Sequence, residues 1–211
     1  MAESTKRKRA DTVTVETIKS GGDVTLLVGE DEDCVGLLVS STWLSSTSPV
    51  FQAMLEGRFS EAVTTRSAES PQELFLPHDD PSGIRDLCAF IHHNVELINT
   101  PWSIDRILEL AIAMDKYDCT SPLQLQTQAL LLEYLDGNTD ASDPEEAGSV
   151  LAAAWLFEDR RAFNIITQRL IQSYIGPLSL LHTSADEDEL PYKVLCTYLP
   201  REKRLASLTI L

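Results

Sequence analysis

The 211-residue sequence lacks any run of about 18 consecutive apolar residues, the length at which a membrane-spanning helix is suspected. We also expect no secretory leader, because the basic residues Lys6, Arg7, Lys8 and Arg9 are followed by polar positions instead of an apolar segment. We therefore expect no membrane partner and an intracellular chain, either cytoplasmic or nuclear.

Positive charge is scarce. The sequence has 17 Lys and Arg against 33 Asp and Glu, which gives a formal net charge of −16. Phosphate backbones are bound by clustered cations, so this balance argues against a nucleic-acid groove. It also disfavours binding to an anionic lipid surface. We expect no direct contact with nucleic acid.

Cysteine is rare, and its spacing matches no disulfide framework or metal site. The four cysteines lie far apart among apolar residues, and no two have CxxC spacing: Cys34, Cys88, Cys119 and Cys196. This pattern favours free, buried thiols in a reducing compartment.

Catalytic and metal-binding motifs are missing too. No serine lies in a GxSxG turn, and no histidine has an HExxH or triad-like context. His92, His93 and Glu96 are spaced like metal ligands one helical turn apart, but without further ligands they are better interpreted as partly exposed helix residues. The acidic stretch after Asp136 begins like a calcium loop and lacks its central glycine and final glutamate. We expect no enzymatic activity, no metal and no cofactor.

The composition, with 43% hydrophobic and 24% charged residues, predicts a folded chain with a core. Strand patterns dominate its first third. They predict an edge strand over 12–16, a hairpin of two strands over 24–28 and 35–39, and a short strand over 73–76. Between them, two short helices are expected to meet at Ser48-Pro49, where serine caps and proline begins a helix.

After residue 80 every pattern is helical. The first helix is expected to begin at Asp80-Pro81 and to bury Val95. The fourth begins at Asp143-Pro144 and is expected to bury Trp155. The other expected helices are 103–117, 121–137, 160–175 and a last piece near 192–199. Strands followed by a run of helices predict an α+β fold.

Several segments together resemble the BTB/POZ family. They occur in the family's order and are Gly22-Asp23-Val24-Thr25-Leu26-Leu27-Val28, Ser48-Pro49-Val50-Phe51, Leu74-Phe75-Leu76-Pro77 and Ala113-Met114-Asp115-Lys116-Tyr117-Asp118-Cys119. The acidic hairpin turn and the later Ala-rich helix look most like the fungal branch. The chain departs from the family at Leu37 and Ser40, where a Phe and a His are usual.

The resemblance implies a BTB/POZ fold, a small mixed sheet capped by helices, over residues 20–120. Residues 1–19 would be a flexible basic tail with an edge strand, and residues 121–211 an all-helical C-terminal extension. The implied function is that of a non-enzymatic protein-interaction module, which self-associates as a homodimer and recruits protein partners.

Family members dimerise through the first helix and the N-terminal segment. The corresponding candidates here are Val13, Val15, Trp43 and Leu44, with 13 and 15 in a strand that subunits exchange. A homodimer face needs an apolar patch of roughly 800 Å² per subunit. An equally open interpretation is that these residues cover their own core.

The resemblance also suggests a narrower function, that of a substrate adaptor in a cullin-RING ubiquitin ligase. Phe59 and Glu61 match in position the hydrophobic residue and glutamate through which family adaptors contact the cullin scaffold. The alternative is that Phe59 packs on its own helix. No recognisable substrate-reading domain accompanies them.

A second hypothesis is a nuclear transcription cofactor that recruits regulators through its BTB dimer. Lys6, Arg7, Lys8 and Arg9 would then act as an import signal. The alternative interpretation of the same residues is a solvated basic tail.

Overall fold

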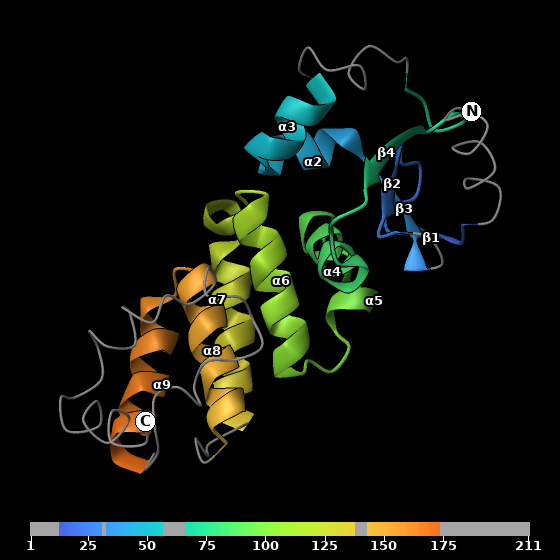
Figure 1. The fold of residues 1–211 in the computed structure, drawn as a ribbon. Coiled ribbons are helices and arrows are strands. Elements are labelled where there is room, and N and C mark those ends of the chain that lie inside the picture. The colour runs from blue at the N-terminus through green and yellow to red at the C-terminus, as the bar shows by residue number, and fades with distance from the viewer. Residues whose placement is uncertain (1–12, 31–32, 57–65, 138–142, 174–211) are drawn as a thin grey trace. The chain divides into compact units, whose positions relative to one another are not determined.

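The computed structural model describes residues 13–30, 33–56, 66–137 and 143–173 of the chain. The described part is an α+β structure with a four-stranded sheet, as expected from the sequence (Figure 1). Its elements in chain order are β1 Val15–Thr17, β2 Val24–Val28, β3 Val35–Val39, α2 Ser41–Thr47, α3 Pro49–Glu56, β4 Gln72–Leu76, α4 Pro81–Ile91, α5 Val95–Ile98, α6 Ile104–Lys116, α7 Thr120–Gly137, α8 Pro144–Leu156 and α9 Arg160–Ser173.

The chain divides into two compact units. Unit 1 contains the described residues up to Thr100 together with Lys116–Cys119, and therefore holds the sheet and helices α2 to α5. Unit 2 contains Pro101–Asp115 and the described residues from Thr120 onward, and is all-helical.

The sheet has the strand order β1-β3-β2-β4. Strands β2 and β3 form the expected antiparallel hairpin, while β4 runs parallel to β2 and β1 parallel to β3. One face buries alternate apolar residues of β2, β3 and β4, including Leu26, Leu37 and Leu74. Helix α4 lies on this face, because its Arg85 makes a two-point ion pair with Glu16 of β1 at 2.7 and 2.9 Å. The predicted edge strand is thus confirmed as an edge.

Gly22, just before β2, lies where only a glycine fits. A Cβ atom at this position would be 2.5 Å from the carbonyl oxygen of Val39. That oxygen is fixed, since it accepts a hydrogen bond of 3.0 Å from the Asp23 amide. We expect Gly22→Ala to lower the free energy of unfolding by about 1–3 kcal/mol, the usual range for overpacking. Urea unfolding monitored by circular dichroism measures this change.

The control is Gly137→Ala in unit 2, where an added Cβ has no atom within 4 Å. This variant should unfold like the parent chain. Equal urea midpoints for Gly22→Ala and the parent would contradict the packing described at Val39.

Several helices begin where the sequence predicts, each with its own cap. Ser48 Oγ accepts a hydrogen bond from the Phe51 amide at 3.0 Å, and Asp80 Oδ1 accepts one from Gly83 at 2.7 Å. Asp143 Oδ1 accepts from the Glu145 amide at 3.0 Å. Each side chain satisfies an amide that the first helical turn leaves unpaired.

Helices α4, α6 and α8 end at a residue with left-handed backbone, at His93, Asp118 and Glu158, whose φ angles are 50°, 52° and 55°. At two of these joints the next residue then caps the following helix. Asn94 donates its amide to Ala89 O and accepts from the Leu97 amide, and Asp159 likewise donates to Ala154 O before capping α9. A left-handed residue followed by such a bond is the Schellman ending of a helix.

Two predictions about buried side chains are wrong. Val95 is 60% exposed, because α4 ends at Ile91 and Val95 begins the separate helix α5. Trp155 is 42% exposed, although most of the other residues of α8 are buried, on every side of the helix. A continuous apolar run has no helical period, so the pattern does not indicate which residue faces outward.

Unit 2 is built from long helices. Helix α9 packs against α7 and α8, and Tyr134 of α7 donates a hydrogen bond of 2.5 Å to Glu146 of α8. Within the described ranges, none of the helices combines the length and the apolar character that crossing a bilayer requires.

Candidate interaction site

Ser48, Phe51 and Asp79 meet around Tyr117 in unit 1. Its ring stacks on Phe51, with the centroids 4.2 Å apart and the planes 13° from parallel. Ser48 Oγ donates to the Tyr117 carbonyl oxygen at 2.6 Å, and the Tyr117 hydroxyl donates to Asp79 at 3.2 Å. Asp79 also pairs with Lys116 at 2.8 Å. These residues therefore hold three distant segments of the chain together, a structural role.

The Tyr117 hydroxyl and the thiols of Cys88 and Cys119 are kept in their uncharged forms. Burial raises the pKa of the Tyr117 hydroxyl far above its ordinary value, and the negative charge of Asp79 adds to the effect. Burial also raises the pKa of the Cys119 thiol to about 11 and that of Cys88 further. A thiol with such a pKa is no nucleophile at neutral pH. The predicted free thiols agree with Cys88 and Cys119, which are buried and unbridged, while Cys34 is half-buried.

The turn between β3 and α2 is anchored by His92. Its Nε2 accepts a hydrogen bond of 3.0 Å from the Ser40 amide, and its Nδ1 lies 2.8 Å from the Cys88 carbonyl oxygen. An amide can only donate, so Nε2 is the unprotonated nitrogen and Nδ1–H donates to Cys88. The prediction of a partly exposed His92 is wrong, since its residue exposure is 4%. His92 thus supplies a polar anchor for the turn that contains Ser40.

Asp23 fixes the other side of the same turn. Its carboxylate accepts 2.7 and 2.6 Å hydrogen bonds from the amide and hydroxyl of Ser41, the first residue of α2. Burial raises the pKa of Asp23, but the bonds from Ser41 outweigh this and lower it below the ordinary value. The orientation of α2 is therefore set by Asp23 and His92 together.

Trp43 is the exposed aromatic residue that this anchored helix presents. It is 38% exposed, and its ring lies 5.6 Å from that of His93 in an edge-to-face contact. The Lys19 ammonium lies 5.3 Å from its centroid, within the range of a cation–π contact. An indole held on two sides loses little freedom when a partner covers its remaining surface.

The other candidates for the dimer face differ in how exposed they are to solvent. Leu44 is fully buried in unit 1, so it covers its own core and is not available to a partner. Val13 is half-buried and Val15 is 50% exposed. Strand β1, which begins at Val15, pairs with β3 of the same chain, so the described arrangement is not an exchanged strand.

Val15 faces away from the buried side of the sheet. Its side chain lies over Gly36, where an added Cβ would come within 2.9 Å of a Val15 methyl group. Across the sheet the same row continues through Leu27 to Phe75, which is 39% exposed. Val15 and Phe75 therefore give this sheet face apolar character at both edges.

Two sets of predicted residues lie outside the described residues. These are Phe59 and Glu61, the candidate cullin contacts, and Lys6, Arg7, Lys8 and Arg9, the candidate import signal. Both remain predictions.

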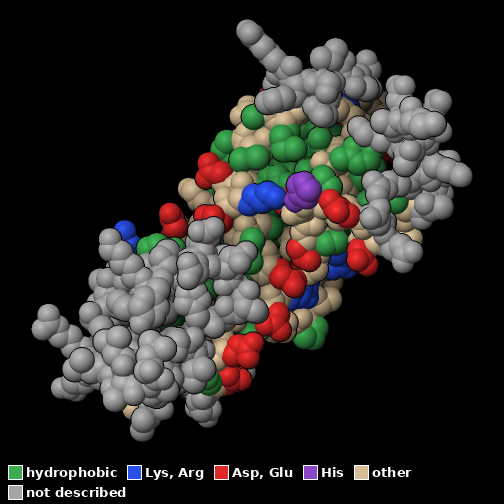
Figure 2. Space-filling view, viewed as in Figure 1, with side chains coloured by type: hydrophobic (Ala, Val, Ile, Leu, Met, Phe, Trp, Pro, Cys, Tyr) green, Lys and Arg blue, Asp and Glu red, His purple; other side chains and the backbone are tan. Residues whose placement is uncertain are grey.

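Acidic side chains are spread over the visible face, with few basic ones between them (Figure 2). In the described part of the chain, no group of three or more His, Cys, Asp and Glu side chains is arranged to hold a metal ion. His92 in particular uses both ring nitrogens within the protein.

The chain was also compared with known proteins. No family model and no curated protein matches it. The site must therefore be interpreted from its own residues.

Proposed function

We propose that the chain is a non-enzymatic protein-interaction module of the BTB/POZ type, whose first unit self-associates and recruits a protein partner. A mixed sheet of a β-hairpin and a parallel third strand, capped by short helices, supports this proposal. So does the convergence of Ser48, Phe51 and Tyr117, which belong to the segments that resemble the family.

The observation that carries the proposal is Trp43. Tryptophan is among the residues most enriched at binding hot spots. Its helix is fixed at its start by Asp23 and His92, and its ring by Lys19 and His93. This pre-organisation reduces the entropy cost of forming an interface.

Strand β1 adds a second means of contact. It is one of the two outer strands of the sheet, and within the described ranges no further strand pairs with its outer edge. An open edge accepts a strand from another chain through backbone hydrogen bonds. The exposed Val15 would add apolar contact beside it.

Self-association is tested by multi-angle light scattering at micromolar concentration. The parent should give twice the chain mass of 23.4 kDa. We expect Trp43→Ala to raise the dissociation constant of the dimer at least about tenfold, as truncation of an interface hot spot does. A dilution series for each variant measures this constant.

Val95→Ala is the matched control, because Val95 is an exposed apolar residue of the same unit on helix α5. It should leave the dimer unchanged, while circular dichroism verifies that all variants are folded. A parent that stays monomeric, or equal weakening by both substitutions, would contradict the proposed face.

A further inference from the structure

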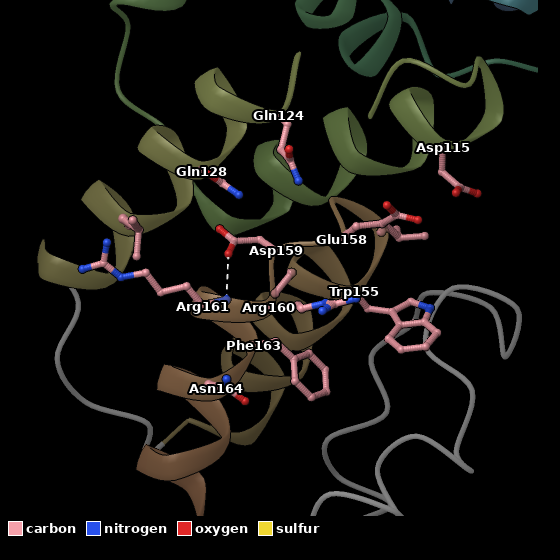
Figure 3. A pocket seen from close by; sticks show the side chains of 13 residues that line it. Asp115, Gln124, Gln128, Trp155, Glu158, Asp159, Arg160, Arg161, Phe163 and Asn164 are labelled. Carbon is pink, nitrogen blue, oxygen red and sulfur yellow. Dashed lines mark hydrogen bonds between the residues drawn. The ribbon is translucent and has the colours of Figure 1, made fainter. Parts of the chain in front are cut away.

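A solvent-open groove of about 1080 Å³ lies within unit 2, between α7 and the joint of α8 with α9. Figure 3 shows the glutamine side chains of α7 on one side and Trp155 and Phe163 on the other. A volume at the upper end of small-molecule pockets, combined with an open form, fits a segment of polypeptide better than an enclosed small ligand. All of its lining residues belong to unit 2.

The wall of this groove contains a buried carboxylate in which only one of the two oxygens accepts hydrogen bonds. Asp159 is 1% exposed, and its Oδ1 caps α9 by accepting from the amides of Arg161 and Ala162 at 3.0 and 3.1 Å. Its Oδ2 accepts no hydrogen bond from any residue that the structure describes. In Figure 3 this oxygen points toward the part of the groove that carries Gln124 and Gln128.

A buried acceptor without a donor is costly, typically by about 1–3 kcal/mol and more when it is charged. The cost is removed when a donor enters the groove. A cationic donor would gain most, because a charge-assisted hydrogen bond shielded from water is roughly twice as strong as a neutral one.

Other residues of the groove favour the same kind of ligand. Asp115 and Glu158 add two carboxylates to that of Asp159. Arg160 and Arg161 also line the groove, and in Figure 3 the Arg161 side chain extends away from the Asp159 carboxylate. Trp155 offers an exposed aromatic surface on which an aliphatic side chain or a guanidinium can lie. The net charge of −16 would attract a basic partner from a distance.

We propose that this groove of unit 2 binds a peptide segment of a partner protein in which a lysine or arginine reaches Asp159 Oδ2 and a neighbouring apolar side chain packs on Trp155. The proposal gives the second unit a recognition role of its own. It concerns a different surface from the self-association proposed for unit 1 and does not depend on it.

The experiment pans a random dodecapeptide phage library on the full-length chain. The selected peptides should share a lysine or arginine next to an apolar residue. The most enriched peptide is then synthesised with a fluorescent label, and its affinity is measured by anisotropy. Replacing its basic residue by norleucine should weaken binding at least tenfold. A selection without enrichment of basic residues over the input library would overturn the proposal.

Asp159→Asn is the decisive protein variant. Asparagine is as good a helix cap as aspartate, so α9 should keep its start. The charge is lost and an amide group replaces the free oxygen, so we expect at least tenfold weaker binding of the labelled peptide. Undiminished binding by this variant would overturn the proposal.

Asp143→Asn is the matched control, because it changes the charge equally at the cap of α8. Asp143 does not line the groove. This variant should bind the peptide within about twofold of the parent. Light scattering tests unit 1 and anisotropy tests unit 2, so failure of either proposal leaves the other standing.

Discussion

Phe51→Ala should lower the free energy of unfolding of unit 1 by about 3–5 kcal/mol, the range for truncating a buried aromatic residue. Phe51 is fully buried, and its ring stacks 4.2 Å from that of Tyr117. Its loss removes the packing that joins α3 to the segment after α6. A shift of the urea midpoint, measured by circular dichroism, gives the magnitude.

Phe75→Ala is the same chemical change in the same unit, at a residue that is 39% exposed. It should cost less than about 1 kcal/mol, since much of the ring already contacts water. Similar costs for the two substitutions would contradict the assignment of Phe51 to the core of unit 1.

Acid should destabilise unit 1 through His92. Burial lowers the pKa of His92 below its ordinary value of 6.5, although the hydrogen bond to Cys88 opposes this. Protonation would also place a hydrogen on Nε2, which could then no longer accept the hydrogen bond from the Ser40 amide. Since the unfolded chain binds this proton more readily, the contribution of His92 to stability is full above pH 6.5 and is lost as the pH falls toward the lower pKa of the folded state.

His92→Gln should remove this part of the pH dependence. At pH 7 we expect the substitution to cost about 1–3 kcal/mol, because a glutamine amide does not reproduce the ring geometry that bonds Ser40 and Cys88 at once. Between about pH 6.5 and 5 the variant should lose stability less steeply than the parent, whose slope includes up to about 1.4 kcal/mol per pH unit from one proton.

Urea unfolding at several pH values measures both effects. His78→Gln is the control, since the His78 side chain is 83% exposed. Parallel slopes for the parent and His92→Gln would contradict the neutral, buried state of His92.

The sequence was informative wherever a local pattern decides the structure. Alternation of apolar residues predicted the hairpin of β2 and β3, and the Ser48, Asp80 and Asp143 caps predicted three helix starts. These features depend on neighbours within a few positions of each other, so a linear sequence contains them.

Features that depend on distant partners could not be predicted in the same way. The interaction of His92 with Ser40 joins residues 52 positions apart, and nothing near either residue indicates it. The carboxylate oxygen of Asp159 that accepts no hydrogen bond is recognised only once the groove around it is known. The exposure of Trp155 follows from the same packing.

The end of α4 was missed for a different reason. Sequence rules look for glycine after the last helical turn, whereas this chain places His93, Asp118 and Glu158 in the left-handed region. The left-handed conformation costs these residues some free energy, which the surrounding hydrogen bonds offset. The predicted continuation to Val95 failed at one of these joints.

At two of these joints a single residue, Asn94 or Asp159, both closes one helix and opens the next. The bond that closes the first helix and the cap that opens the second belong to the same residue. An insertion or deletion of even one amino acid there would divide them between different residues and turn the second helix about its axis. We therefore expect evolutionary relatives of this chain to vary in length elsewhere and to keep the register of these two connections.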